Sequence, residues 1–428
     1  MTSSTDFMFK WIAGVTWYHS LDEAANTGTR SDTGASTGFG NRYQDQKSKA
    51  IFANVTYPVT DKFRATGGIR YTDESNYSYN LESGRNNGRP EIVNMTYSAP
   101  DYKVGIEYDL AENSMMYSDY STSYRTQGMG TTPTGQPFPA EKLKAITLGA
   151  KNRFFGNRMQ VNASAYYYMY KNYMAVTGVG SLTDDYTGPG AHVGLDYIDN
   201  NGNDRFDIGI DTILDGVGTG MPGPGGDGTS MDENAKQVGD AKVYGLDIQT
   251  STIVTDNFKV DLSVSYLKKY FTRLFFPFNQ ITNDLGIPDL DYSGKDMTFA
   301  PRWTVNASLN YNIPLWNGGT LTSRLDSRFQ SSYKMYFLEQ AVGISKDRMT
   351  GAISIVYTPL SKAAIQEPYH ISDFTLVYAH PNGKWSLTGY VKNLEGYAVK
   401  RSIVVMGNTS DMIIGPPRTY GAILSFRF

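Results

Sequence analysis

Strict alternation of apolar and polar residues is the feature that most constrains this chain. Between residues 302 and 313 every second residue is apolar, and Thr, Asn or Ser stands at the positions between. The apolar members are Trp303, Val305, Ala307, Leu309, Tyr311 and Ile313. Segments 258–266, 161–170 and 63–72 have the same period of two. Because successive side chains of a β-strand point to opposite faces, whereas a helix repeats every 3.6 residues, these segments are predicted to be strands.

The same period, followed along the whole chain, predicts fourteen strands. We expect them near residues 8–19, 47–58, 63–78, 101–109, 114–124, 143–154, 158–171, 242–254, 257–270, 302–313, 320–333, 369–380, 384–394 and 419–428. Residues 91–98 are expected to extend a hairpin outward. At roughly 10–14 residues the strands exceed the usual length of about 5–6 in soluble sheets. They are long enough to cross a bilayer, which takes about 9–11 tilted residues.

The connections between these strands alternate between short and long. Short turns are expected at 58–62, 110–113, 155–157, 255–256, 314–319 and 381–383, and long connections at 20–46, 79–100, 125–142, 172–241, 271–301, 334–368 and 395–418. In an antiparallel sheet this order places every short turn at one end and every long loop at the other. Outer-membrane β-barrels have this arrangement, and a β-sandwich has no reason to adopt it. The predicted fold is therefore all-β, an antiparallel transmembrane outer-membrane β-barrel.

Composition fits this fold and excludes several functions. Charged residues make up 19% of the chain, below the roughly 25% of soluble domains. The mean hydropathy of −0.40 is that of a soluble protein, but the polar face of a barrel strand dilutes its average hydropathy. No apolar run reaches the length of a transmembrane helix. The net charge of −3 gives no field for nucleic acid. The absence of Cys excludes disulfides and thiolate chemistry.

The carboxyl terminus carries the sharpest motif. Tyr420, Ala422, Leu424, Phe426 and the terminal Phe428 share one face of the last predicted strand. An amphipathic final strand that ends in Phe resembles the assembly signal of outer-membrane barrels. This resemblance implies that the barrel assembly machinery recognises the strand through Phe428.

Further motifs resemble the barrel of TonB-dependent receptors. They are residues 389–394 (GYVKNL) with Gly396 and Tyr397, 416–421 (PPRTYG), 67–72 (GGIRYT), 117–125 (YSDYSTSYR), 144–151 (KAITLGAK) and 241–248 (AKVYGLDI). The fifth lacks the Glu that the family has before its Gly, and the sixth has Asp247 in place of Glu. Their order and spacing over nearly the whole chain carry the resemblance.

The resemblance implies that residues 1–428 are the carboxyl-terminal part of a larger barrel. The family barrel has twenty-two strands and a plug, and this chain resembles its last fourteen strands. The sequence shows no signal peptide, plug or TonB-binding box, so we expect the natural start to lie upstream. The parent protein is expected to import a scarce nutrient, most commonly an iron–siderophore complex, by active transport. Its implied partners are outer-membrane lipid, the nutrient ligand and, through the missing segments, the TonB complex.

Three rival functions remain open. A free-standing fourteen-stranded channel or passive transporter fits the strand count. An outer-membrane enzyme needs a converging acid, base or nucleophile. The sequence has no nucleophile-elbow motif, and its four His residues are scattered without a zinc-binding spacing. We therefore expect no catalytic activity. A large soluble adhesin predicts recovery without detergent.

One loop carries a candidate metal site. Asp199, Asn201, Asn203 and Asp207 occupy positions 1, 3, 5 and 9 of a string that resembles a calcium-binding loop. Ca²⁺ needs several oxygen ligands that converge from a tight turn, and this spacing supplies them. The Gly and the bidentate Glu of a complete loop are absent. A solvated acidic loop is the competing and favoured interpretation, and no cofactor is required.

Charged and aromatic residues of the predicted strands allow two interpretations. Arg64, Arg70, Arg324 and Arg328 are expected to face the lumen, where they bind an anionic siderophore or, as we favour, line a polar interior. Trp17, Tyr57, Trp303 and Trp385 are expected to form aromatic girdles at the membrane interfaces. Tyr333, Tyr336 and Phe337 are candidates for a ligand surface, although no spacing singles them out.

Overall fold

The computed structural model of the chain contains one large antiparallel sheet. It describes residues 2, 8–29, 36–82, 91–126, 138–176, 197–198, 212–213, 236–276, 290–335, 340–346, 353–359, 364–406 and 409–427. Within these residues it shows no helix long and apolar enough to span a membrane.

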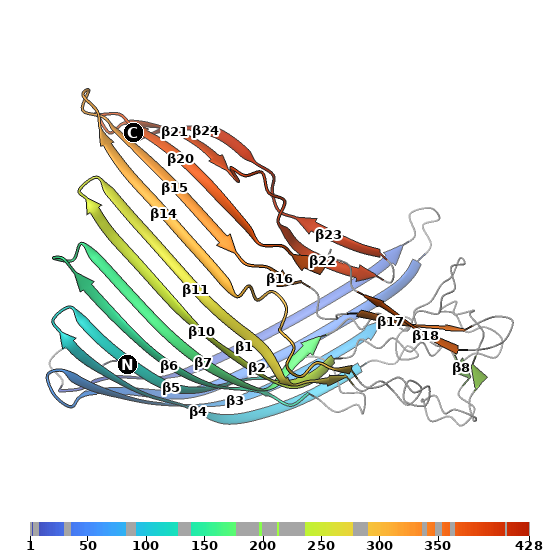
Figure 1. The fold of residues 1–428 in the computed structure, drawn as a ribbon. Coiled ribbons are helices and arrows are strands. Elements are labelled where there is room, and N and C mark those ends of the chain that lie inside the picture. The colour runs from blue at the N-terminus through green and yellow to red at the C-terminus, as the bar shows by residue number, and fades with distance from the viewer. Residues whose placement is uncertain are drawn as a thin grey trace.

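The large sheet has fourteen strands, and each pairs with the sheet strands before and after it in sequence (Figure 1). They are β1 (Lys10–Thr29), β2 (Ser36–Pro58), β3 (Phe63–Glu82), β4 (Glu91–Ala111), β5 (Ser114–Arg125), β6 (Glu141–Phe154), β7 (Met159–Val176), β10 (Lys236–Thr255), β11 (Phe258–Arg273), β14 (Trp303–Pro314), β15 (Thr320–Gln330), β20 (Tyr369–Ala379), β21 (Trp385–Lys392) and β24 (Thr419–Phe426). All fourteen predicted strands are confirmed. β1 and β24 form the two edges of the sheet.

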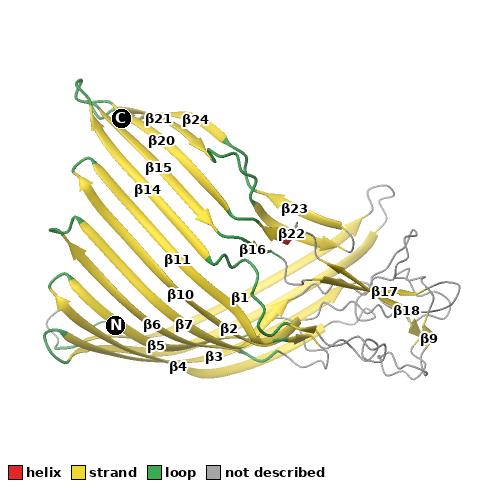
Figure 2. Cartoon of the chain, viewed as in Figure 1, coloured by secondary structure: helices red, strands yellow, loops and turns green. Residues whose placement is uncertain are grey.

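Small two-stranded ladders lie within the long connections (Figure 2). The pairs are β8 (Tyr197–Ile198) with β9 (Thr212–Ile213), β12 (Phe275–Phe276) with β13 (Leu290–Asp291), β16 (Tyr333–Lys334) with β19 (Ile365–Gln366), β17 (Gln340–Lys346) with β18 (Ile353–Pro359), and β22 (Lys400–Met406) with β23 (Thr409–Ile414). The short turns gather at the opposite end of the sheet, as the sequence predicts. The sorting of loops by length is thus confirmed.

Several strands are longer at their outer ends than the sequence predicts. β2 begins at Ser36 rather than near residue 47, and β4 begins at Glu91, which includes the expected extension at 91–98. The residues added to β2 at 40–46 are, apart from Tyr43, polar on both faces or Gly. Alternation cannot reveal them, because it records a strand only where one face contacts an apolar phase. These ends extend as hairpins beyond the apolar band.

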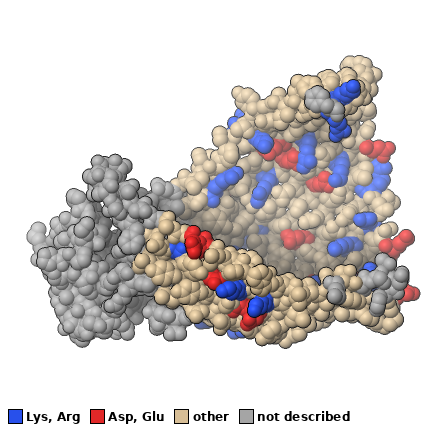
Figure 3. Space-filling model, turned by 180° about the vertical axis from the view of Figure 1, so that it is seen from behind, with Lys and Arg blue, Asp and Glu red and all other residues tan. Residues whose placement is uncertain are grey.

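The two faces of the sheet differ in chemistry. Val15, Ile51 and Tyr71 stand in one row across β1, β2 and β3. Their side chains are exposed, Val15 at 79%. A soluble monomer rarely exposes a continuous apolar surface of this kind. The opposite face is polar and lines a hollow, in which Lys, Arg, Asp and Glu side chains lie (Figure 3). The apolar face is therefore the lipid-facing surface of the barrel wall.

Buried clusters lie at the outer ends of the strands rather than in a central core. One contains Phe271 and Leu274 with Tyr292 and Met297 from the connection before β14. In the terminal strand, Tyr420 is 80% exposed and Phe426 60% exposed on the lipid-facing side. Phe428 lies outside the described residues, so its predicted part in assembly stays a prediction.

Candidate functional site

The hollow face of the sheet is built from rows of polar residues that run across neighbouring strands. One row contains Gln160, Ser251, Asp261, Ser308, Asp326 and Asp373, each paired with the next on β7, β10, β11, β14, β15 and β20. Because side chains alternate along each strand, all six lie on the same face. This acidic row places three carboxylates at one height on the wall.

Basic side chains adjoin the acidic row on the side of the short turns. The Lys259 ammonium lies 3.0 Å from Asp261, and Arg324 Nε lies 2.7 Å from Asp326. The third carboxylate, of Asp373, accepts a hydrogen bond of 2.8 Å from the backbone N–H of Asn393. The acidic row is therefore matched by donors from the wall itself.

The next row toward the long loops is mostly neutral. It contains Asn162, Gln249, Ser263, Asn306 and Arg328, paired across β7, β10, β11, β14 and β15. Within the described residues, Arg328 has no carboxylate partner. Its positive charge is therefore available to a group outside the wall.

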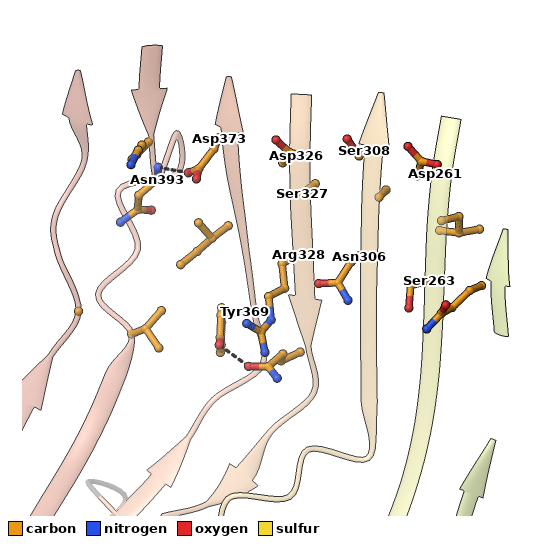
Figure 4. A pocket seen from close by; sticks show the side chains of 18 of the residues that line it. Asp261, Ser263, Asn306, Ser308, Asp326, Ser327, Arg328, Tyr369, Asp373 and Asn393 are labelled. Carbon is orange, nitrogen blue, oxygen red and sulfur yellow. Dashed lines mark hydrogen bonds between the residues drawn. The ribbon is translucent and has the colours of Figure 1, made fainter. Parts of the chain in front are cut away.

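These rows line a cavity of about 1080 Å³. Figure 4 shows Asp261, Asn306, Arg328, Tyr369 and Asp373 reaching into it from four strands. On the side of β21, Lys392, Lys400 and Arg401 also line the cavity, together with Pro416 and Pro417. The lining thus combines a row of carboxylates with four cations and many amide and hydroxyl groups, a surface suited to a polar ligand or a polar protein segment.

Aromatic residues mark the outer end of this cavity. The Tyr369 hydroxyl donates a hydrogen bond to the side-chain oxygen of Gln330. The rings of Tyr369 and Tyr397 stack with centroids 5.7 Å apart and planes at 13°. Tyr333 lines the same cavity, so one of the three aromatic ligand candidates lies there. Tyr336 and Phe337 lie outside the described residues.

The loop after β21 is fixed to this wall by Glu395. Its carboxylate accepts a 2.7 Å hydrogen bond from the backbone N–H of Ser372 and lies 3.0 Å from His370 Nε2. Burial opposes ionisation, but hydrogen bonds from Ser372 outweigh it and hold the pKa of Glu395 below its ordinary value. The cavity wall that this loop contributes therefore depends on an ionised Glu395.

The predicted lumenal arginines lie on the hollow face with different partners. Arg64 donates to Glu107 at 2.8 Å and also pairs with Asp109. Arg70 donates to Thr16 and Thr72, each at 3.1 Å. Together with Arg324 they are held by the wall, as the lining interpretation expects. Arg328 is the exception.

The predicted girdle residues lie on strands of the large sheet. Tyr57 and Trp385 lie at the end with the short turns, and Trp303 lies at the opposite end, 5.0 Å from the ring of Tyr266. Trp17 is 70% exposed on β1. Two aromatic levels at opposite strand ends fit the two interfaces of a bilayer.

The candidate calcium loop is not tested by the structure. Asp199, Asn201, Asn203 and Asp207 lie outside the described residues, and the site stays a prediction. In the part of the chain that is described, no three His, Asp or Glu residues are grouped so that they suit a metal ion. The acidic row was not predicted from the sequence. Its signal was present, because Asp261 stands among the polar members of an alternating segment.

One family model matches most of the chain. Residues 2–394 match the family model described as TonB dependent receptor-like, beta-barrel. No curated protein matches the sequence. Among solved structures, the chain is similar to the ferric yersiniabactin uptake receptor FyuA from Yersinia pestis, with 14% identity and a TM-score of 0.66. That match covers 99% of this chain and 52% of the receptor.

Two further structures show the same fold. The ferric-catecholate import receptor Fiu from E. coli K12 has 16% identity and a TM-score of 0.60, covering 99% of this chain and 52% of Fiu. The copper transporter OprC has 14% identity and a TM-score of 0.62, covering 100% of this chain and 55% of OprC. The chain thus spans about half the length of the structures it matches.

Proposed function

Because the chain belongs to the TonB-dependent receptor-like β-barrel family, a family of the bacterial outer membrane, we propose that it forms part of the wall of an energised importer for a ferric–siderophore complex. Coupling to TonB and gating belong to the whole receptor, of which this chain supplies the barrel wall and outer loops. The family and its structural neighbours are transport receptors rather than enzymes.

The cargo proposal has two supports. Among similar structures, FyuA is named a ferric yersiniabactin uptake receptor, Fiu a ferric-catecholate import receptor and PiuA from Acinetobacter baumannii a siderophore receptor. Among the described residues, Arg328 has no carboxylate partner, and it lies beside Asn306 in a cavity lined by Tyr333 and Tyr369. Many iron chelates are anionic and rich in oxygen acceptors, so a guanidinium with hydroxyl and amide neighbours suits them. Arg328, which has no carboxylate partner among the described residues, is the observation that carries the proposal.

Uptake of radiolabelled iron tests it. Cells that lack the natural receptor gene would express the complete receptor, either unchanged or with Arg328→Gln, and would be offered a panel of ferric siderophores. We expect saturable uptake of one chelate, reduced roughly tenfold by the loss of one charge-assisted contact. Arg158→Gln is the matched control, because Arg158 lies in a short turn on the far side from the loops.

Deletion of the TonB motor separates the proposed function from its main alternative. Energised import predicts that uptake stops in the motor-deficient strain. A free-standing channel or passive transporter predicts that uptake persists and that the isolated chain conducts ions in a planar bilayer. The unbroken ladder of fourteen strands favours this second candidate. A closed fourteen-stranded channel requires β1 to pair with β24. Among the described residues, each of these two strands pairs only with its one neighbour in the sheet.

A further inference from the structure

The lipid-facing surface carries a group of lysines on three adjacent strands. Lys144 of β6, Met169 of β7 and Lys242 of β10 stand side by side in one row of paired residues. Lys171 lies two positions beyond Met169 on β7 and hence on the same face. We name Lys144, Lys171 and Lys242 the outward lysine cluster.

The cluster lies where the apolar band ends on the side of the long loops. Nearer the short turns, the same face holds Ile146 and Leu148 on β6 and Leu246 on β10, which are 44%, 51% and 42% exposed. Exposed apolar residues on the outside of a barrel mark the hydrocarbon region. The lysine ammonium groups are therefore at the level of the lipid headgroups in the outer leaflet.

Tyrosine rings lie beside and below Lys242 on the same face. The rings of Tyr167 and Tyr244 stack with centroids 6.3 Å apart, and Tyr270 meets Tyr244 edge-on at 6.5 Å. The Lys242 ammonium lies 5.9 Å from the centroid of the Tyr167 ring. Lysine stems packed on interfacial aromatics hold their charged ends toward the headgroups.

The positive charge of the cluster is not neutralised by the described part of the chain. There, none of the three lysines forms an ion pair. Lys171 also stands directly opposite Lys142 across the β6–β7 pair, and facing like charges destabilise a sheet. This arrangement calls for an external anion.

Asp240 of β10 and Asp296 of the connection before β14 already have partners. Asp240 accepts from Arg273 Nε at 3.4 Å and from the backbone N–H of Asn172 at 3.4 Å. Asp296 pairs with Lys268 and, at 2.9 Å, with Arg302. Neither is available to the cluster.

We propose that the outward lysine cluster binds the phosphate of a phosphorylated lipid in the outer leaflet. Three ammonium groups on neighbouring strands attract an anionic headgroup, and the exposed apolar residues beneath them contact the acyl chains of the same molecule. This second contact favours a lipid over free phosphate. The proposal depends on the outer-membrane location and not on the identity of the cargo.

Binding of a defined lipid to the detergent-extracted complete receptor tests the proposal. The probe is a bisphosphorylated, acylated glucosamine disaccharide, compared with the same lipid after phosphatase treatment and with inorganic phosphate as competitor. We expect each Lys→Gln change at 144, 171 and 242 to weaken binding about fivefold, and the triple variant on the order of 100-fold. The unchanged receptor should bind the dephosphorylated lipid as weakly as the triple variant binds the intact lipid. Millimolar phosphate should not displace the intact lipid from the unchanged receptor.

Two controls keep the outcome clear. The triple Lys→Arg variant keeps the three charges and should keep the affinity for the lipid. The variant with both Lys47→Gln and Lys49→Gln removes two lysines from β2, far along the sheet, and should also leave the affinity unchanged. Heat-dependent gel mobility reports folding, and the single variants replace the triple variant if it does not fold. Unchanged affinity in the Gln variants, or equal affinity for the dephosphorylated lipid, would overturn the proposal. Displacement by millimolar phosphate would replace it with a site for the free ion.

Discussion

The side chain of Asn393 and the backbone of Tyr397 close a ring of two hydrogen bonds. Asn393 Nδ2 donates to the carbonyl oxygen of Tyr397 at 3.0 Å, and Asn393 Oδ1 accepts from the N–H of Tyr397 at 3.0 Å. Asn393 has a φ of 55°, in the left-handed region that Asn tolerates better than most residues. This ring turns the chain off β21 and starts the loop that contributes Lys400 and Arg401 to the cavity.

Replacement of Asn393 by Ala is expected to release this loop. The change removes both hydrogen bonds and a third to the carbonyl oxygen of Pro416, and it leaves Ala with a positive φ. We expect a local destabilisation of about 2–4 kcal/mol. Proteolysis of the folded receptor between residues 394 and 418 should accelerate. Asn393→Asp keeps the acceptor and should give an intermediate rate; equal rates for all three proteins would show that the ring does not hold the loop.

Gly149 is expected to be sensitive to substitution because of Tyr117. The two residues face each other across β5 and β6, and a Cβ at position 149 would overlap the Tyr117 ring. The ring also lies under Lys151, whose ammonium is 5.5 Å from its centroid. Gly149→Ala should therefore lower the free energy of unfolding by about 1–3 kcal/mol, measured in urea.

A second glycine provides the matched control. A Cβ at Gly67 meets nothing within 4 Å, so Gly67→Ala should leave the urea midpoint nearly unchanged. In the variant that combines Tyr117→Ala with Gly149→Ala, the Gly149 effect should largely disappear. Additive effects of the two changes would contradict a direct clash.

Glu395 is expected to make the loop after β21 sensitive to acid. Its pKa is below the ordinary value of 4.5, because the hydrogen bonds from Ser372 outweigh burial. A group with a depressed folded pKa stabilises the structure above its unfolded pKa, and this contribution is lost as the pH falls through the folded value. Protease sensitivity of the 394–418 segment should therefore rise as the pH drops below about 4.5. Glu395→Gln should remove this pH dependence, and a persistent dependence would assign it to other groups.

The strands were predictable because one face of each contacts an apolar phase. Val305, Ala307 and Leu309 alternate with Asn306 and Ser308, and this period holds regardless of ligand or partner. The outer end of β2 was predicted too short because residues on both of its faces are mostly polar, whereas the extension of β4 at 91–98 was expected. The sorting of loops by length followed from the strand positions alone.

The candidate site was harder to predict because it depends on register. Asp261, Asp326 and Asp373 are separated by 65 and 47 positions in the sequence and form one row only through the pairing of four strands. Likewise, Arg64 and Arg328 look alike in sequence. Only the structure shows that Arg64 is paired with Glu107 and Asp109, whereas Arg328 has no partner among the described residues.

The central claim is that the sheet is a membrane-spanning wall with a lipid face and a water-filled, ligand-facing side. The chain has no Cys, so single cysteines at successive positions 304–311 of β14 can each carry a nitroxide label in reconstituted vesicles. The measurement is accessibility to oxygen, which concentrates in lipid, relative to a water-soluble nickel chelate. We predict that oxygen dominates at positions 305, 307 and 309 and the nickel chelate at 306, 308 and 310. Uniform access of the nickel chelate along the strand would contradict the account, because it would leave β14 without a lipid face.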